Sequence, residues 1–191
     1  MTKKQEWQAL QDACSNCRQC TLHQGRTQVV FGVGNPNSPI LLIGEGPGEQ
    51  EDLQGVPFVG PAGKLLDDML SIIDIDRHTN CYIGNIVKCR PPRNRDPLEE
   101  EQDACIGYLR SQVALVRPKI IVCLGRIAAQ KLIDENYRIT RQHGQWVNKN
   151  GIWMTAIYHP SALLRDVRKR PETFDDLLSI REKIREVGAR V

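Results

Sequence analysis

Two runs of apolar residues limit what this chain can fold into more than any other feature of the sequence. The runs are Ile40–Ile43 and Ile120–Leu124, and neither alternates with polar residues. Continuous apolar runs of this length are typical of strands buried on both faces of a parallel sheet. Helices must then cover both faces of the sheet, so the sequence predicts an α/β protein.

Other segments fit the same scheme. Further strands are predicted at residues 81–87 and 152–158, and residues 28–33 also have the pattern of a strand. Apolar residues recur at helical spacing in the segments 62–73, 98–116, 125–134 and 174–187. We therefore expect a three-layer sandwich, in which a central, mostly parallel four-stranded sheet is flanked by helices, as a single domain over residues 1–191.

In such sheets, ligands bind beyond the carboxyl ends of the strands. The segments expected there are Gly44–Gly48, Asn85–Arg95, Gly125 and His159–Arg165. Residues 88–95 contain two consecutive prolines and predict an irregular loop. Asp96 is expected to cap the helix that follows, with Pro97 at its first position.

The net charge of +3 carries little information, but the basic residues are placed unevenly. One group consists of Lys88, Arg90, Arg93 and Arg95, and a second of Arg165, Arg168, Lys169 and Arg170. Two basic groups on a mildly basic chain fit contact with a nucleic-acid backbone, although charge runs alone more often mark solvated loops.

The N-terminal residues predict no signal peptide, because no apolar stretch follows Lys3-Lys4-Gln5-Glu6. The longest apolar runs are too short to cross a membrane. We therefore expect a cytoplasmic protein without membrane contact. A reducing cytoplasm disfavours structural disulfides, so the seven cysteines point to metal binding or to burial.

Cys14, Cys17 and Cys20 have the spacing C-x2-C-x2-C, and Cys89 and Cys105 follow much later in the chain. A close triple favours metal binding, and all-thiolate sites suit either zinc or an iron–sulfur cluster. The wide separation of the second pair is less typical of a zinc ribbon, but the spacing alone leaves both metals open.

The remaining cysteines, Cys81 and Cys123, fall in predicted strands and are expected to be buried as small apolar residues. The segment around the close triple, residues 6–24, is polar and predicts short helical turns.

The glycine-rich segment Gly44–Gly48 follows a predicted strand, but it is not a nucleotide-binding loop. A dinucleotide fingerprint requires a glycine where Glu49 stands, and the Gly-Lys-Ser/Thr of a Walker loop does not follow. The glycines allow a ligand to approach the backbone closely, and the neighbouring carboxylates suit water handling or hydrogen bonding to a neutral ligand. An acidic surface turn is an equal alternative.

Taken together, five stretches of the sequence resemble the family 4 uracil-DNA glycosylases, which carry an iron–sulfur cluster. The stretches are Asn16–Thr27, Gly44–Glu49, Pro57–Gly63, Asn85–Arg95 and His159–Arg165. The resemblance implies a uracil-DNA glycosylase-like fold and a monofunctional enzyme that hydrolyses the N-glycosidic bond of deoxyuridine in DNA. Its products are free uracil and an abasic site, and it initiates base excision repair. We expect a monomer.

The same resemblance implies a [4Fe–4S] cluster held by Cys17, Cys20, Cys89 and Cys105, with a cluster-binding segment at about residues 1–25. Cys14 departs from the family pattern. We interpret it as a spare thiol, with an exchange for Cys17 as the alternative. In the family the cluster is structural and ties the N-terminus to the Cys89 loop beside the DNA-binding face.

The residues that the resemblance assigns to the flipped nucleotide are Gly46, Glu51, Phe58, Asn85 and His159. Phe58 stacks under the base, Asn85 distinguishes uracil from cytosine by hydrogen bonds, and Glu51 excludes thymine. His159 stabilises the departing uracil anion, and Glu45 positions or activates the attacking water.

Contacts with DNA are implied for Arg90, Arg93, Leu163, Leu164 and Arg165. The two leucines and Arg165 form a wedge and phosphate contact that fill the gap left by the flipped base.

Two alternatives to this enzyme have different sequence requirements. A relative that binds uracil-DNA covalently carries an inserted basic loop with a histidine nucleophile, and residues 90–98 contain neither feature. A non-catalytic iron–sulfur or zinc module would use the basic loops alone, and the presence of Glu45, Phe58, Asn85 and His159 argues against it.

Overall fold

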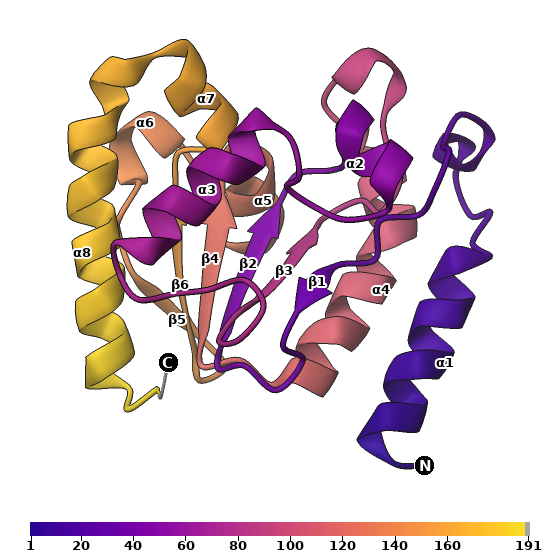
Figure 1. The fold of residues 1–191 in the computed structure, drawn as a ribbon, viewed down its shortest axis with the longest axis horizontal. Coiled ribbons are helices and arrows are strands. Elements are labelled where there is room, and N and C mark those ends of the chain that lie inside the picture. The colour runs from indigo at the N-terminus through magenta and orange to yellow at the C-terminus, as the bar shows by residue number, and fades with distance from the viewer. Residues whose placement is uncertain (190–191) are drawn as a thin grey trace.

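A mixed sheet of six strands separates two layers of helices in the computed structural model, which describes residues 1–189 (Figure 1). The strands are β1 (Val33–Gly34), β2 (Ile40–Gly44), β3 (Tyr82–Asn85), β4 (Ile120–Leu124), β5 (Val147–Lys149) and β6 (Ile152–Ile157). Their order across the sheet is β1-β3-β2-β4-β6-β5. The predicted α/β class is confirmed.

The predicted core of four parallel strands corresponds to β3, β2, β4 and β6, which pair in parallel. The prediction of four strands in total is wrong, because the described residues also contain the short antiparallel edge strands β1 and β5. Of the segment 28–33, only Val33 joins the ladder, opposite Ile83. Strand β5 escaped prediction because Val147-Asn148-Lys149 is short, polar and half-exposed to exposed.

The helices complete the sandwich. The α-helices are α1 (Lys3–Ser15), α2 (Glu49–Gln54), α3 (Pro61–Ser71), α4 (Glu99–Val116), α5 (Arg126–Leu132), α6 (Ile139–Gln142), α7 (Pro160–Arg165) and α8 (Arg170–Glu186). Short 3-10 helices are η1 (Thr21–Gln24), η2 (Pro92–Asn94) and η3 (Val167–Lys169). Within residues 88–95, the predicted irregular loop therefore contains one helical turn, in which Arg93 has φ +55°.

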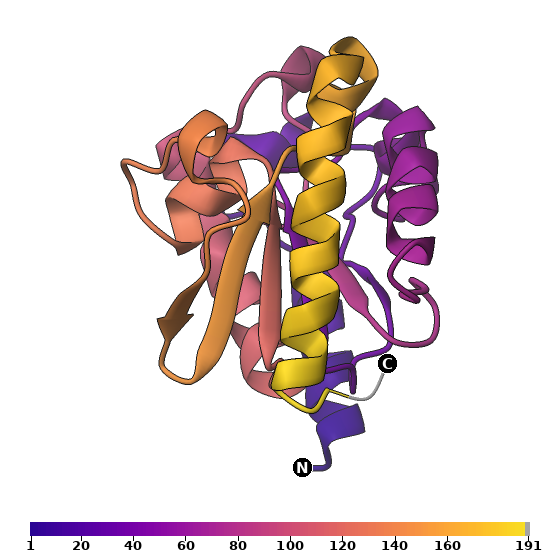
Figure 2. The same cartoon turned by 90° about the vertical axis from the view of Figure 1, so that its left-hand side faces the viewer.

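Alternate residues of the central strands face opposite helical layers. Leu41 and Ile43 belong to the hydrophobic cluster under α4 and α5, whereas Ile40 and Leu42 belong to the cluster under α3 and α8. Figure 2 shows α8 running along its face of the sheet. Continuous apolar runs are thus required here, because both faces of each central strand are covered.

The N-terminal segment differs from its prediction. A helix of 13 residues, α1, replaces the expected short turns, and Thr2 and Gln5 cap it reciprocally. Only a few apolar side chains of α1 face inward, and Trp7 packs edge-on against Phe31 and Tyr82, with ring centroids 5.5 and 5.1 Å apart. The sparse apolar face of α1 hides its helical period in the sequence.

Helix α4 also begins later than predicted. Leu98, not Asp96, is its N-cap residue, and the Glu101 carboxylate accepts the Leu98 backbone N–H at 2.8 Å. The Asp96 carboxylate instead accepts a hydrogen bond from Arg126 on α5 at 2.6 Å. The ion pair explains why Asp96 is not available as a cap.

Among residues 1–189, no helix has the length and apolar character needed to cross a membrane. The single-domain prediction covers residues 1–191, of which residues 190–191 lie outside the described part.

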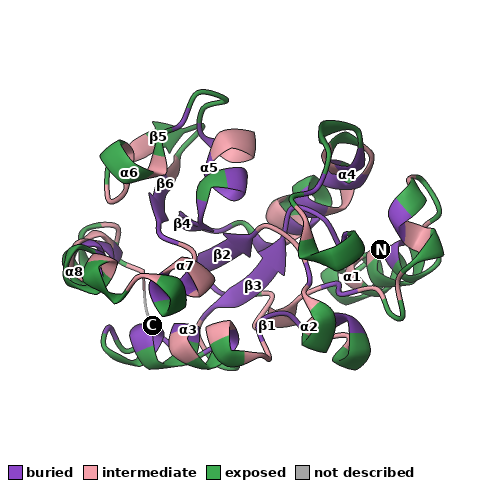
Figure 3. Ribbon diagram, turned by 90° about the horizontal axis from the view of Figure 1, so that it is seen from above, coloured by how far each residue is buried: buried purple, intermediate pink, exposed green. Residues whose placement is uncertain are grey.

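The chain reverses direction across the sheet at β2. It moves from β2 to β3 on one side and then to β4 on the other, which makes the carboxyl end of β2 the switch point of the sheet. Figure 3 views the molecule from this end, where α2, α5 and α7 surround the strand ends. A ligand site is expected at this place.

Candidate active site and cysteine-lined pocket

A pocket of about 570 Å³ opens at the carboxyl ends of the central strands. Its lining includes Glu45 after β2, Asn85 at the end of β3, Gly125 after β4 and His159 after β6. Phe58, from the loop between α2 and α3, also lines it. Residues that are far apart in the sequence therefore meet where the sheet topology predicts a site.

Asn85 brings an unused hydrogen-bond acceptor into this pocket. Its side chain is 2% exposed, and its Oδ1 has no partner among the described residues. A Cβ on Gly44 would lie 2.5 Å from this oxygen and 2.7 Å from the Phe58 ring, so only glycine fits beside them. A buried acceptor without a partner is unfavourable unless a ligand supplies the donor.

Phe58 is held in an unusual backbone conformation. Its φ is +53°, and a Cβ on Gly63 would lie 1.9 Å from its carbonyl oxygen. The Glu51 carboxylate accepts the backbone N–H groups of Val59 and Gly60 at 2.9 and 3.1 Å, which anchors the loop that carries Phe58. Glu51 lines the pocket as well, and its exclusion of thymine stays a prediction.

His159 is prepared to act as a neutral donor. Its Nδ1 accepts the backbone N–H of Ser161 at 3.1 Å and lies 2.7 Å from the Ser161 Oγ. Burial, and secondly the charge of Arg165, lower the pKa of His159 to about 4, against a small opposite effect of Glu51. The ring is therefore neutral at pH 7, and because Nδ1 accepts, its proton resides on Nε2.

Glu45 is half-buried and lines the same pocket. Burial, and secondly the neighbouring Asp96, raise the pKa of its carboxyl to about 7, while Arg126 and Arg165 counteract the rise. The adjacent Gly46 also lines the pocket, and a Cβ there would lie 2.7 Å from Val87 Cγ2. The carboxyl of Glu45 thus exchanges a proton close to neutral pH.

Ser161, Asp96 and Arg126 line this pocket and had no predicted role there. Ser161 lies within the quoted stretch His159–Arg165, but only its contact with the imidazole reveals what it does. Asp96 and Arg126 carry no sequence signal that links them, because 30 residues separate them in the chain.

The three residues of the predicted wedge differ in their exposure. Leu163 is 1% exposed and packs in the hydrophobic cluster under α3 and α8, so the prediction that it contacts DNA is wrong. Leu164 is 43% exposed, and Arg165 is exposed at the pocket lining. The rotation of α7 turns one leucine inward and its neighbour outward.

The first basic group is also smaller than predicted. Lys88 is 1% exposed and donates a hydrogen bond to Gln112 Oε1 at 2.7 Å, so it faces the interior. Arg95 donates two hydrogen bonds to the Glu101 carboxylate, at 2.7 and 2.8 Å. Arg93 is exposed on η2.

Arg90 is half-buried beside this loop and donates a hydrogen bond to Asn94 Oδ1 at 2.8 Å. With Arg93, it remains a candidate for DNA contact.

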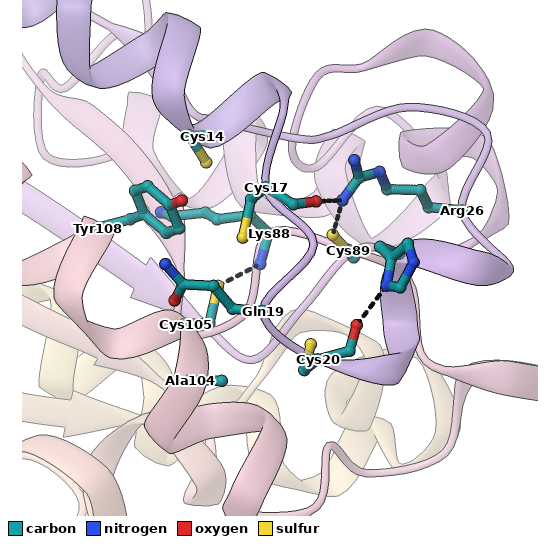
Figure 4. Close-up of a pocket in the computed structure, with 11 residues that line it drawn as sticks. Cys14, Cys17, Gln19, Cys20, Arg26, Lys88, Cys89, Ala104, Cys105 and Tyr108 are labelled. Atoms are coloured by element: carbon teal, nitrogen blue, oxygen red, sulfur yellow. Dashed lines mark hydrogen bonds between the residues drawn. The ribbon is translucent and has the colours of Figure 1, made fainter.

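A second pocket collects cysteines from three distant parts of the chain (Figure 4). The cysteines that line it are Cys14, Cys17, Cys20, Cys89 and Cys105. The four predicted ligands are thus brought together, and Cys14 on α1 joins them. Cys81 and Cys123 lie elsewhere and are fully buried, as predicted, although Cys81 directly precedes β3.

The thiols line a common pocket but do not converge on a point. The cavity between the lining residues is small, with a volume of about 10 Å³. Within residues 1–189, no three His, Cys, Asp or Glu side chains stand close enough to hold a single metal ion. Burial raises the pKa of the Cys14 thiol to about 12 and that of the Cys105 thiol to about 11.

Comparison with known proteins places this architecture in a family. Residues 31–180 match the family model described as the uracil DNA glycosylase superfamily. The type-4 uracil-DNA glycosylase of Archaeoglobus fulgidus is 45% identical over 177 residues, which cover 87% of each chain. The type-4 uracil-DNA glycosylase of Thermotoga maritima is 41% identical over 86% of each chain. That of Sulfurisphaera tokodaii is 43% identical over 87% of this chain and 80% of its own.

The chain thus belongs to a class of enzymes, the uracil DNA glycosylase superfamily. Within that class, the chain belongs to the type-4 uracil-DNA glycosylases, as its sequence motifs predicted.

Proposed function

We propose that this protein hydrolyses the N-glycosidic bond between uracil and deoxyribose in DNA, releases free uracil, and leaves an abasic site for base excision repair. The family membership supports the activity. The observation that carries the choice of base is the buried Oδ1 of Asn85, which has no partner among the described residues.

Asn85 supplies the hydrogen-bonding pattern that uracil needs. A nucleotide flipped out of the duplex offers its Watson–Crick edge to the pocket. The Oδ1 of Asn85 accepts the N3–H of uracil, and its Nδ2 donates to O4. Cytosine presents an acceptor at N3 and a donor at C4, so it leaves buried polar groups of Asn85 unpaired.

Phe58 supplies a face for the base that does not depend on its identity. Stacking of a base on an aromatic ring contributes about 1–3 kcal/mol. The missing side chain at Gly44 makes room for the Phe58 ring and the Asn85 amide beside the β2 backbone. Glu51, which anchors the same loop, is proposed to close the side on which thymine carries its methyl group.

Two groups are proposed to act on the reacting bond. Negative charge grows on uracil as the bond breaks, and the Nε2–H of His159 donates to O2 of that anion. Glu45 orients the water that attacks the sugar, and its carboxylate stabilises the positive charge that develops there. Arg90, Arg93, Leu164 and Arg165 are proposed to contact the DNA around the flipped nucleotide.

The cysteine-lined pocket fits an iron–sulfur cluster. The donor set is made of thiols from three segments of the chain that line one pocket, which is the ligand chemistry that such a cluster requires. Cys17, Cys20, Cys89 and Cys105 would hold a [4Fe–4S] cluster. When bound, it cross-links the segment after α1, the loop after β3 and helix α4, which stabilises the loop beside the pocket.

The activity is tested with an oligonucleotide that contains one uracil. Incubation with the purified protein followed by alkali should cleave the strand at that position, and cytosine- and thymine-containing controls should stay intact. An absence of cleavage by protein with an intact brown chromophore refutes the proposal. A protein–DNA adduct that survives denaturation instead supports the covalent alternative, and reversible binding alone supports the non-catalytic one.

The monomeric state and the cytoplasmic location stay predictions. Sedimentation at several protein concentrations measures the first, and cell fractionation measures the second.

A further inference from the structure

The motif Gly25-Arg26-Thr27 has no part in the proposed excision of uracil, yet Arg26 lines the cysteine pocket. Its Nη1 donates to Cys89 Sγ at 3.3 Å and to the backbone oxygen of Cys17 at 2.8 Å (Figure 4). Its Nη2 donates to the backbone oxygen of Ser15 at 3.4 Å. One guanidinium therefore joins the N-terminal cysteine segment to the loop after β3.

A hydrogen bond from Arg26 to a backbone oxygen of the Cys89 loop would be enough to join the two segments, but the bond ends on the Cys89 sulfur instead. A guanidinium is charged at all relevant pH values and offers a rigid fork of donors. Here Nη1 donates to a cysteine sulfur that we assign as a ligand, while Nη1 and Nη2 also donate to backbone oxygens of the N-terminal cysteine segment. The backbone N–H of Lys88 donates to Cys105 Sγ at 3.3 Å, so a second ligand sulfur also accepts a hydrogen bond.

Donors of this kind matter to a cluster with thiolate ligands. The thiolates outnumber the positive charge of the iron–sulfur core, so the assembly is an anion in a partly buried site. Hydrogen bonds to the sulfurs and nearby positive charge stabilise the more negative, reduced form and so raise the reduction potential. Groups that hold metal ligands in place also slow the loss of the metal.

We infer that Arg26 is a positioning residue of the cluster site, which places a fixed positive charge on the Cys89 sulfur and locks the Cys17 segment against it. The inference rests on the cluster that is part of the proposed function. It goes further, because it assigns a role in cluster retention and potential to a residue outside the four ligands.

The test compares the full-length protein with Arg26→Gln, Arg26→Lys and the control Arg18→Gln. Arg18 lies in the same segment and is exposed, so its substitution makes the same change in net charge without touching the pocket. The measurements are iron and sulfide per chain, visible absorbance, the midpoint potential of the cluster, and the rate of iron loss to a chelator. Circular dichroism monitors the fold.

Arg26→Gln is expected to lower the midpoint potential and to speed iron loss by about 10- to 100-fold. Arg26→Lys keeps the charge but loses the fork, so its potential should lie between those of Arg26→Gln and the wild type. Arg18→Gln should match the wild type in both measurements, because an exposed charge is screened by solvent and salt.

The outcomes separate the two proposals. A wild-type protein without iron and sulfide refutes the cluster itself. A loaded wild type whose potential and iron loss are unchanged in Arg26→Gln refutes the role of Arg26 and leaves the cluster standing. If Arg26→Gln does not load, Arg26→Lys decides, since a wild-type potential in that variant overturns the inference. If neither variant takes up the cluster and both keep the wild-type fold, the result supports the inference. If they lose the fold, the result overturns the inference.

Discussion

The imidazole of His159 accepts the backbone N–H of Ser161 at its Nδ1, 3.1 Å away. Because a backbone amide can only donate, this contact determines the tautomer of the neutral ring. The proton is left on Nε2. His159 is also the N-cap residue of α7, so the same hydrogen bond that starts the helix prepares the donor.

This relationship predicts unequal effects of two substitutions. His159→Ala removes the donor to the leaving group, and single-turnover excision should slow by about 10²- to 10³-fold. Ser161→Ala removes only the hydroxyl contact, while the backbone N–H that sets the tautomer remains, so the rate should fall by less than about tenfold. Equal losses in both variants would show that the Oγ, not the backbone, controls the imidazole.

The raised pKa of Glu45 predicts a pH dependence of the chemical step. If the carboxylate is the active form, the single-turnover rate should rise with pH and level off above about pH 7. His159, with its pKa lowered to about 4, should add no further step between pH 5 and 9. Glu45→Gln should abolish the rise and lower the plateau, and a profile that keeps its midpoint in this variant contradicts the assignment.

The same shift has a consequence for folding. The pKa of Glu45 is higher in the folded protein than the ordinary value of 4.5, so ionisation is disfavoured by the fold. The resulting loss of stability is absent below pH 4.5, grows as the pH rises to about 7, and is complete above that. Glu45→Gln should therefore raise Tm at pH 8 and leave it nearly unchanged at pH 4.

Much of this architecture follows from local patterns in the sequence. The apolar run Ile40–Ile43 predicts a central strand because burial on both faces leaves no room for polar residues. Strand β5 has one neighbour and few buried side chains, so its pattern is weak. Contacts between distant residues cannot be predicted from a local pattern, for a different reason. Lys88 looks like a surface cation, and only its partner Gln112, 24 residues later, explains its burial.

Replacing Asn85 is expected to lower the rate of excision without lowering the stability of the fold. Asn85→Ala removes the acceptor that reads uracil, so excision should fall by about 10²-fold or more. It also removes a buried oxygen that has no partner within the described residues, so thermal unfolding should occur at the same or a higher temperature. Parallel measurements of rate and Tm test both statements. A large drop in Tm would mean that Asn85 stabilises the fold through contacts of its own.

The close packing of Asn85 and Phe58 around Gly44 predicts that a larger residue at this position prevents uracil from binding. Gly44→Ala puts a methyl group about where Asn85 Oδ1 and the Phe58 ring now lie, at 2.5 and 2.7 Å. Excision should be lost with only a modest loss of stability, because the displaced groups border an open pocket. Gly107→Ala is the matched control, since its methyl group meets no atom within 4 Å and alanine favours the helix. It should leave excision unchanged and stabilise the protein slightly.

Substitutions of Cys14, the fifth cysteine of the pocket, test whether it is a spare thiol or can replace Cys17 as a ligand. Cys14 is 1% exposed on α1 and is not among the four cysteines that we propose as ligands. Cys14→Ala should therefore keep the iron content and visible absorbance of the wild type, whereas Cys17→Ala should lose both. Retention of the chromophore in Cys17→Ala, followed by its loss in the double variant Cys14→Ala/Cys17→Ala, would demonstrate the exchange. Cys123→Ala serves as the control, because Cys123 is buried in β4, outside the cysteine pocket, and its substitution should leave the iron content intact.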